Sequence, residues 1–151
     1  MRITTRGRYA LRATLALAHL GKNEKPVSIN CLSEQEEISS VFLEQIFFKL
    51  RKAGIVSSVR GPGGGFYFTR GLDKITVKQI LDAAGEELDL TFCDKHAERC
   101  GRLGDCMSHQ VWVDVTGLVN NFFAGITLES ILEKYEDKET PTTVPEAGKH
   151  E

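Results

Sequence analysis

Long apolar runs are missing from this 151-residue sequence. No apolar segment approaches the roughly 18 residues that a membrane-spanning helix needs, so we expect no membrane association. Residues 1–8 are basic and lack the apolar core of a signal peptide. We therefore expect a cytoplasmic protein.

Cysteine is scarce and unevenly placed. Three of the four cysteines lie within residues 93–106, whereas Cys31 stands apart. Thiols stay reduced in the cytosol, so disulfides are not expected. A group of thiols favours metal binding or redox chemistry instead. We expect Cys31 to be a small buried core residue.

The sequence also lacks the residue patterns that catalysis requires. It shows no nucleophile–base arrangement and no paired carboxylates. The glycine-rich segment 61–65 is not followed by the lysine of a phosphate-binding P-loop. We therefore expect a binding protein rather than an enzyme.

Charge is distributed asymmetrically, although the net charge is only −2. Residues 1–70 contain eleven Lys and Arg against five Asp and Glu, a net charge of +6. Residues 71–151 contain eight against sixteen, a net charge of −8. A basic first half suits a polyanionic partner such as nucleic acid, while a solvated charged surface is the alternative.

Periodicity and capping residues predict a mostly α fold with a small β-hairpin wing. Helices are expected over residues 6–20, 28–35, 40–53, 76–84 and 109–124, with a short last helix after Thr127. The expected capping residues are Thr4 or Thr5, Ser39 or Ser40, and Thr76. The helix over 40–53 has one apolar stripe that should be buried: Leu43, Ile46, Phe47 and Leu50. Two β-prone runs, 55–60 and 66–69, flank the glycine-rich turn 61–65. Three helices followed by a glycine-tipped hairpin form the order of a winged helix-turn-helix, here followed by a long dimerisation helix.

We divide the chain into four parts. They are a winged helix-turn-helix DNA-binding domain (1–85), a cysteine-rich loop (86–108), a dimerisation helix with a short C-terminal helix (109–135) and a disordered tail (136–151). The apolar stripe of the long helix is wide for so small a head, which favours pairing with a second copy. Packing within its own core is the alternative.

The helix over residues 40–53 is the predicted recognition helix, with its N-terminal residues at base edges of the major groove. Its serine, glutamate and glutamine side chains suit base recognition, and Lys49, Arg51 and Lys52 suit phosphates. Arg60 is placed to enter a minor groove. Phe48 fits either the core or an apolar base contact. The predicted DNA-contacting set is Ser39, Ser40, Val41, Glu44, Gln45, Lys49, Lys52, Ser57, Arg60, Gly61 and Gly63.

A polar loop brings three thiols and an imidazole together within seventeen residues. The candidate ligands are Cys93, Cys100, Cys106 and His109, with Asp94 and His96 as spare candidates. Three cysteines and a histidine suit either a 2Fe-2S cluster or a tetrahedral zinc ion. Metal-free redox thiols are a third possibility, and the spacing leaves all three open. A metal site beside a DNA-reading head indicates a metal-dependent switch.

Four segments resemble the Rrf2 family of bacterial regulators. They are MRITTRGRYA (1–10), FLEQIF (42–47), LRKAGIVSSVRGPGGG (50–65) and CMSHQVW (106–112), and the similarity covers roughly residues 1–134. The resemblance implies a homodimeric transcription factor that binds a palindromic operator in double-stranded DNA. Iron–sulfur-binding members hold a 2Fe-2S cluster through three cysteines and a histidine, which match Cys93, Cys100, Cys106 and His109 here.

This chain departs from the family pattern in three ways. The first cysteine interval is one residue longer than in the iron–sulfur-binding members, Val41 replaces a DNA-contacting serine, and Glu37 replaces a turn glycine. Arg8 stands where nitric-oxide-sensing relatives have an aspartate ligand, which argues against that coordination here. The resemblance predicts a repressor or activator whose affinity or site choice is controlled by a 2Fe-2S cluster, sensing iron–sulfur, redox or nitric oxide status. The alternatives are a zinc- or thiol-redox-responsive regulator of the same fold and, in another class, an iron–sulfur carrier or enzyme.

Overall fold

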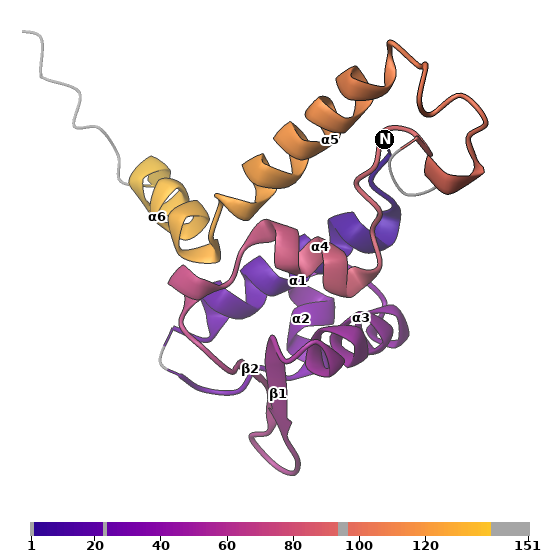
Figure 1. Cartoon of the computed structure of the whole chain (residues 1–151). Helices are drawn as coiled ribbons and strands as arrows, with labels where there is room; N and C mark the ends of the chain where they lie inside the picture. The colour runs from indigo at the N-terminus through magenta and orange to yellow at the C-terminus, as the bar shows by residue number, and fades with distance from the viewer. Residues whose placement is uncertain (1, 23, 94–96, 140–151) are drawn as a thin grey trace, which may run out of the picture.

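A computed structural model of the chain describes residues 2–22, 24–93 and 97–139 (Figure 1). Its elements are α1 (Thr5–Leu20), α2 (Ile29–Glu36), α3 (Ser40–Lys52), β1 (Val56–Val59), β2 (Gly65–Phe68), the 3-10 helix η1 (Leu72–Lys74), α4 (Val77–Ala84), the 3-10 helix η2 (Ala97–Arg99), α5 (His109–Ala124) and α6 (Leu128–Glu139). Helices with one antiparallel hairpin confirm the predicted fold class. Within the described ranges, no helix combines the length and apolar character that crossing a membrane requires.

Hydroxyl side chains begin the four helices of the head. Thr4 accepts a hydrogen bond from the Gly7 amide, and Ser28, Ser39 and Thr76 do the same for α2, α3 and α4. Each cap satisfies an amide that has no partner inside its helix. The structure therefore confirms the capping signals in the sequence and shows that Ser39, rather than Ser40, caps α3.

Helix α1 packs against α2, α3 and α4 around a single main core. Ala10 and Ala13 are fully buried on α1 and allow the other helices to approach closely. The predicted apolar stripe of α3 is buried: Leu43, Ile46, Phe47 and Leu50. Burying side chains of this size stabilises a fold by about 1.5–3 kcal/mol each. This packing fixes which face of α3 points outward.

The hairpin is attached to the head at its base. Its register runs from Val56 opposite Phe68 to Val59 opposite Gly65. Val27 pairs with Phe66 through two backbone hydrogen bonds of 2.9 and 2.8 Å. The Phe66 ring also lies 4.8 Å from that of Phe47, centroid to centroid. The hairpin is therefore held beside α3, while its tip protrudes from the head (Figure 1).

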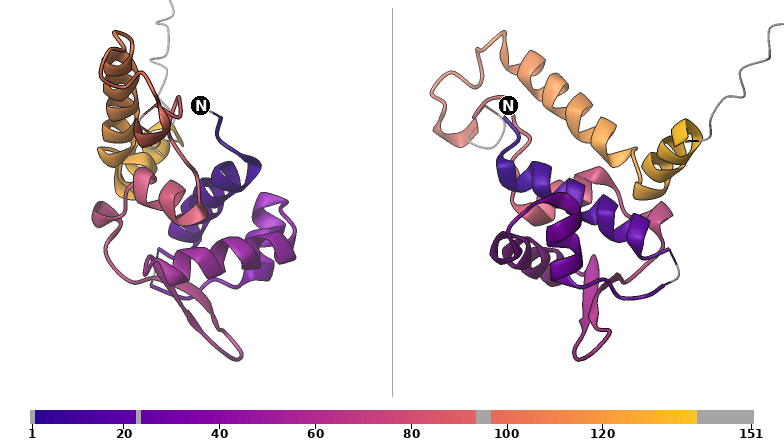
Figure 2. Two further views of the ribbon diagram at one scale, coloured as in Figure 1. Left: turned by 45° about the vertical axis from the view of Figure 1, so that its right-hand side comes forward. Right: turned by 180° about the vertical axis from the view of Figure 1, so that it is seen from behind.

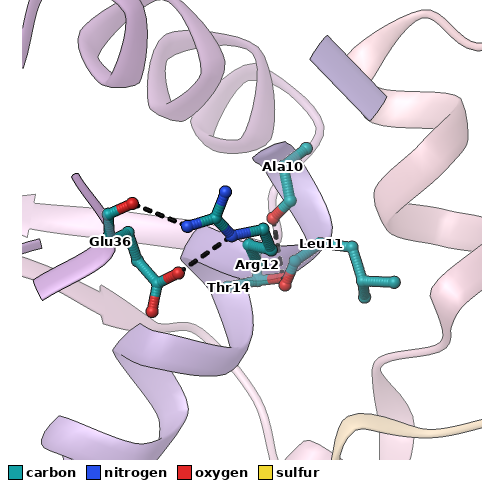
Figure 3. Close-up of polar contacts among 5 residues, drawn as sticks. All are labelled: Ala10, Leu11, Arg12, Thr14 and Glu36. Atoms are coloured by element: carbon teal, nitrogen blue, oxygen red, sulfur yellow. Dashed lines mark hydrogen bonds and ion pairs between the residues drawn. The ribbon is translucent and has the colours of Figure 1, made fainter. Parts of the chain in front are cut away.

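The turn between α2 and α3 is held by α1. The guanidinium of Arg12 donates to a carboxylate oxygen of Glu36 at 3.1 Å and to the Glu36 carbonyl oxygen at 2.6 Å (Figure 3). In the same view, the Thr14 hydroxyl bonds the carbonyls of Ala10 and Leu11, both at 2.9 Å. Arg12 thus joins α1 to the end of α2, where the chain turns toward the recognition helix.

Helix α5 crosses above α4 and projects beyond the head, on the side opposite the hairpin (Figure 2). Thr116 is its one buried residue. Helix α6 returns to contact η1 and α1, and its start is joined to α4 by a bridge between Thr76 and Thr127. The long helix therefore uses little of its apolar surface within its own chain.

Two sequence predictions were wrong in detail. Cys31 is exposed rather than buried, because α2 turns Leu32 alone fully into the core. Helix α6 continues to Glu139, although the disordered tail was expected from residue 136. The extension contains Glu136, Lys138 and Glu139, which are good helix formers and favour the extra turn. Residues 140–151 lie outside the described part of the chain.

Candidate functional site

The outward face of α3 forms one wall of a groove of about 850 Å³. Its lining residues include Val41, Glu44, Gln45, Lys49 and Lys52. All of these except the half-buried Lys49 are exposed. The predicted base-contacting side chains therefore share one accessible surface, because the opposite stripe of α3 is committed to the core.

Some predicted contact residues already have partners within the chain. The Ser39 hydroxyl accepts a hydrogen bond from the Phe42 amide at 3.2 Å, while Ser40 is half-buried in the first turn of α3. The ammonium of Lys49 donates to the Ala84 carbonyl at 3.5 Å. This hydrogen bond directs the Lys49 side chain toward the end of α4. Lys52 has an exposed side chain at the end of α3. It is the better placed of the two lysines for a phosphate.

The wing carries the second group of predicted contacts. Ser57 lies half-buried on β1 opposite Tyr67, and Arg60 follows the strand with an exposed side chain. Gly61 and Gly63 are exposed at the tip, with φ values of +97° and +73° that favour glycine. The tip protrudes next to α3 and away from α5 (Figure 2). Helix face and wing thus lie at the same end of the head.

Arg51, which was expected to bind phosphate together with Lys49 and Lys52, has partners within the chain. Its guanidinium donates to the Ser58 hydroxyl at 3.4 Å, which joins α3 to β1. It also lies over the ring of Phe48, with the guanidinium carbon 5.9 Å from the ring centroid. The structure therefore shows Arg51 bracing the recognition helix against the wing. The Phe48 ring is exposed, which excludes the core alternative for this residue.

The segment after α4 contains a carboxylate that sequence reasoning missed. Glu86 is buried and accepts hydrogen bonds from the Thr4 amide at 3.0 Å, the Thr4 hydroxyl and the Gly7 amide at 3.1 Å. Burial raises the pKa of Glu86, but these hydrogen bonds and the charge of Arg6 together hold the pKa below its usual value. No local sequence pattern predicts this contact of Glu86 with Thr4 and Gly7, because the residues are about 80 positions apart.

The cysteine loop follows directly and leads into α5 (Figure 1). Cys93 and Cys106 are half-buried and Cys100 is exposed, and all four cysteines of the chain are free thiols. His109 begins α5, and its amide donates to the Cys106 carbonyl at 3.2 Å. Among the described residues, no three of these side chains converge on a common point that could hold a metal ion. Asp94 and His96 fall outside the described residues.

The chemistry of the loop nevertheless suits a soft metal centre. The Ser108 hydroxyl, 3.3 Å from the Cys106 sulfur, lowers the pKa of that thiol, with help from nearby backbone amides and Arg102. Thiolates are the ligands of iron–sulfur clusters and of zinc, and an imidazole can complete either set. Arg8 cannot serve as a ligand, and its guanidinium donates to Thr5 at 3.3 Å.

Known proteins resemble this chain over most of its length. A family model described as Rrf2, iron-dependent transcriptional regulator, matches residues 3–134. The transcriptional regulator IscR of Xenorhabdus nematophila is 40% identical over 136 residues, which are 90% of this chain and 82% of IscR. IscR of Pectobacterium atrosepticum is 39% identical over the same shares of the two chains.

Solved structures give the same result. IscR of T. potens superposes with a TM-score of 0.75 at 30% identity, covering 93% of each chain. CymR, the global cysteine regulator of B. subtilis, has a TM-score of 0.73 at 26% identity, covering 89% of this chain and 98% of CymR. These relatives are regulators rather than enzymes, as the absence of a catalytic pattern predicted. The chain belongs to the Rrf2 family of winged-helix, DNA-binding transcriptional regulators.

Proposed function

We propose that this regulator acts in the cytoplasm as a homodimer on a palindromic DNA operator. A 2Fe-2S cluster held by Cys93, Cys100, Cys106 and His109 controls its affinity or choice of site. The observation that carries the DNA-binding part is the exposed face of α3 beside a protruding wing. The donor set of the loop and the similarity to IscR proteins support the cluster.

On duplex DNA, α3 enters the major groove and the hairpin tip reaches the flanking groove. Glu44 and Gln45 meet base edges, where glutamine pairs with adenine and a carboxylate accepts from cytosine. Lys52 neutralises phosphate, and Arg60 at the wing enters the minor groove. The Arg12–Glu36 contact orients this surface by fixing the turn before α3.

The exposed apolar stripe of α5 supports dimerisation. Leu118 and Phe122 are 68% and 66% exposed, and Val111 lies on the same stripe, seven residues before Leu118. An isolated chain would leave these side chains in water. Pairing of two α5 helices covers them and sets the separation of two heads, which must match half-sites about 34–36 Å apart.

The structure offers a path from the loop to the DNA-reading head. Glu86 binds the start of α1, and Leu88 is buried with Val77 and Leu81 in a cluster onto which Ile3 and Phe123 pack. A bound 2Fe-2S cluster would supply an oxidisable centre and would draw Cys93, Cys100, Cys106 and His109 together around it. Bringing Cys93 and His109 together would therefore shift α5, which begins at His109, relative to α1, which is held by Glu86 before the loop.

A thiol- or zinc-responsive regulator of the same fold is the second candidate. It is supported by the structural similarity to CymR, a cysteine regulator, and by the free thiols of this chain. The same three cysteines and histidine would also suit a zinc ion. Analysis of iron, sulfide and zinc in protein purified without oxygen distinguishes the two candidates.

The test combines anaerobic purification, an absorption spectrum and selection of DNA from a random pool with and without bound metal. We expect visible absorption, bound iron and sulfide, and a palindromic site whose affinity depends on the cluster. With 6–10 phosphate contacts, affinity should fall roughly 10³–10⁵-fold between 50 and 200 mM salt. Colourless, metal-free protein that binds its site unchanged would refute the cluster, and a flat salt response would refute the DNA-reading head.

A further inference from the structure

Two apolar side chains stand in the middle of the polar face of α3. Val41 is 65% exposed and Phe48 is 58% exposed. They are seven residues apart, which is two helical turns, so they lie on the same face and about 10 Å apart along the axis. Exposed Glu44 and Gln45 lie between them in sequence.

Phe48 has no access to the core of its own chain. Its neighbour Phe47 is fully buried and packs against Phe66, so the next side chain along the helix points elsewhere. Arg51 lies over the Phe48 ring, with the guanidinium carbon 5.9 Å from the centroid. The ring is therefore steadied on the surface by a cation that is itself bonded to Ser58 of the wing.

We propose that Phe48, together with Val41, determines sequence specificity by contacting thymine methyl groups in the major groove. This inference rests on the proposed insertion of α3 into DNA. The C5-methyl of thymine is the apolar feature of the major groove, and apolar side chains read it by direct contact. Polar and basic side chains surround the pair. Such a surface suits a DNA duplex, whereas an apolar protein partner would need a continuous apolar surface.

The spacing of the two side chains sets the spacing of the bases. A separation of about 10 Å along α3 corresponds to about three base-pair steps of roughly 3.4 Å each. Each half-site should therefore contain two thymines about three base pairs apart, one read by Val41 and one by Phe48. Glu44 and Gln45 then contact the bases between the two thymines.

Replacement of thymine by deoxyuridine tests this directly, because it removes the methyl group and leaves every hydrogen-bonding group in place. The full chain first selects its site from random duplexes, and each thymine of that site is then replaced singly. We expect about a fourfold loss of affinity at two positions per half-site, the equivalent of about 0.8 kcal/mol for one buried methyl group. The other thymines should respond little.

Substitution of the protein assigns each position. Phe48→Ala should abolish the deoxyuridine effect at one thymine and leave the other unchanged, and Val41→Ala should do the reverse. Phe48→Leu, which keeps an apolar contact, should retain most of the effect. Lys52→Ala is the matched control on the same helix face and should weaken all duplexes alike. Melting temperatures of the variants establish that each is folded.

Two results would overturn the inference. One is a selected site with no thymine sensitive to loss of its methyl group, and the other is a deoxyuridine effect that stays undiminished at every thymine in both Phe48→Ala and Val41→Ala. Failure of the wild-type chain to select any duplex would be distinguishable from both results, because it would reject the proposed DNA-binding function together with the inference.

Discussion

Glu86 and Gly7 form a matched pair, in which the carboxylate of one occupies the space that a side chain on the other would need. The Gly7 amide donates to Glu86 at 3.1 Å across 79 positions of sequence. A Cβ atom built on Gly7 would lie only 2.5 Å from the Glu86 side chain. The carboxylate also lies at the N-terminus of α1, where the helix dipole favours a negative charge. This pair fastens the start of the cysteine loop to the first helix of the head.

Gly7→Ala should destabilise the protein, although alanine is the better helix former. Alanine would displace the Glu86 carboxylate from its donors, and loss of buried hydrogen bonds to a charged group costs about 1–3 kcal/mol. Gly117→Ala in α5 is the matched control, because a Cβ there meets nothing within 4 Å. We expect that control to be neutral or to stabilise by up to about 1 kcal/mol. Urea unfolding measures both, and equal effects of the two would contradict the pairing.

The same carboxylate should make stability depend on pH. The folded-state pKa of Glu86 lies below its usual value, so its contribution is complete above the unfolded-state pKa of about 4.3 and disappears as pH falls through the lower folded-state value. Glu86→Gln removes the charge. The difference in unfolding free energy between wild type and variant should therefore be constant near neutral pH and shrink below about pH 4.3. A difference that stays constant into acid would contradict the assignment.

Glu37→Gly should stabilise the turn before the recognition helix. Glu37 caps α2 in the left-handed conformation, with φ of 53° and ψ of 41°. Glycine adopts this conformation without a steric penalty but loses more freedom on folding, so we expect a net gain of about 0.5–1 kcal/mol. The corresponding rise in melting temperature is about 1–4 °C. Glu37→Ala, which keeps the Cβ atom, should show no such rise.

Local signals in the sequence predicted the elements of this fold well. Hydroxyl caps at Thr4, Ser39 and Thr76, and the buried stripe of α3, act over one or two helical turns, and the structure bears them out. Contacts between residues that are far apart in the sequence could not be predicted from it. One example is the hydrogen bond from Lys49 to the end of α4, and another is the hydrogen bond from the start of α1 to Glu86.

The exposure of Cys31 shows a further limit of sequence reasoning. Its average tendency as a small hydrophobic residue favoured burial, but the orientation of α2 is set by Leu32 and by neighbouring helices. The ligand role of Cys93, Cys100, Cys106 and His109 and the contact set on α3 stay predictions. A ligand set depends on how the loop closes around its metal, and a contact set depends on the bound DNA.

Cys93→Ala, Cys100→Ala and Cys106→Ala should each abolish visible absorption and bound iron in protein purified without oxygen. Each substitution removes one of the thiolates that hold iron–sulfur clusters. Cys31→Ala is the matched control, because Cys31 lies on α2 outside the loop. It should retain wild-type absorption and iron. Persistence of colour and iron in all three loop variants would show that the ligands lie elsewhere.

Leu118→Glu should convert the proposed dimer to a monomer. Leu118 is exposed on α5, on the stripe shared by Val111 and Phe122, and a carboxylate there would have to be buried without a partner in the paired helices. Ala124→Glu is the control, since it adds the same charge at an exposed position of α5 that lies about 120° around the helix from Leu118. Sedimentation velocity should give half the wild-type mass for Leu118→Glu and an unchanged mass for the control. Because α6 and the head keep their contacts, the monomer should stay folded but bind a palindrome far more weakly than wild type. An intact dimer in Leu118→Glu would place the interface on another surface.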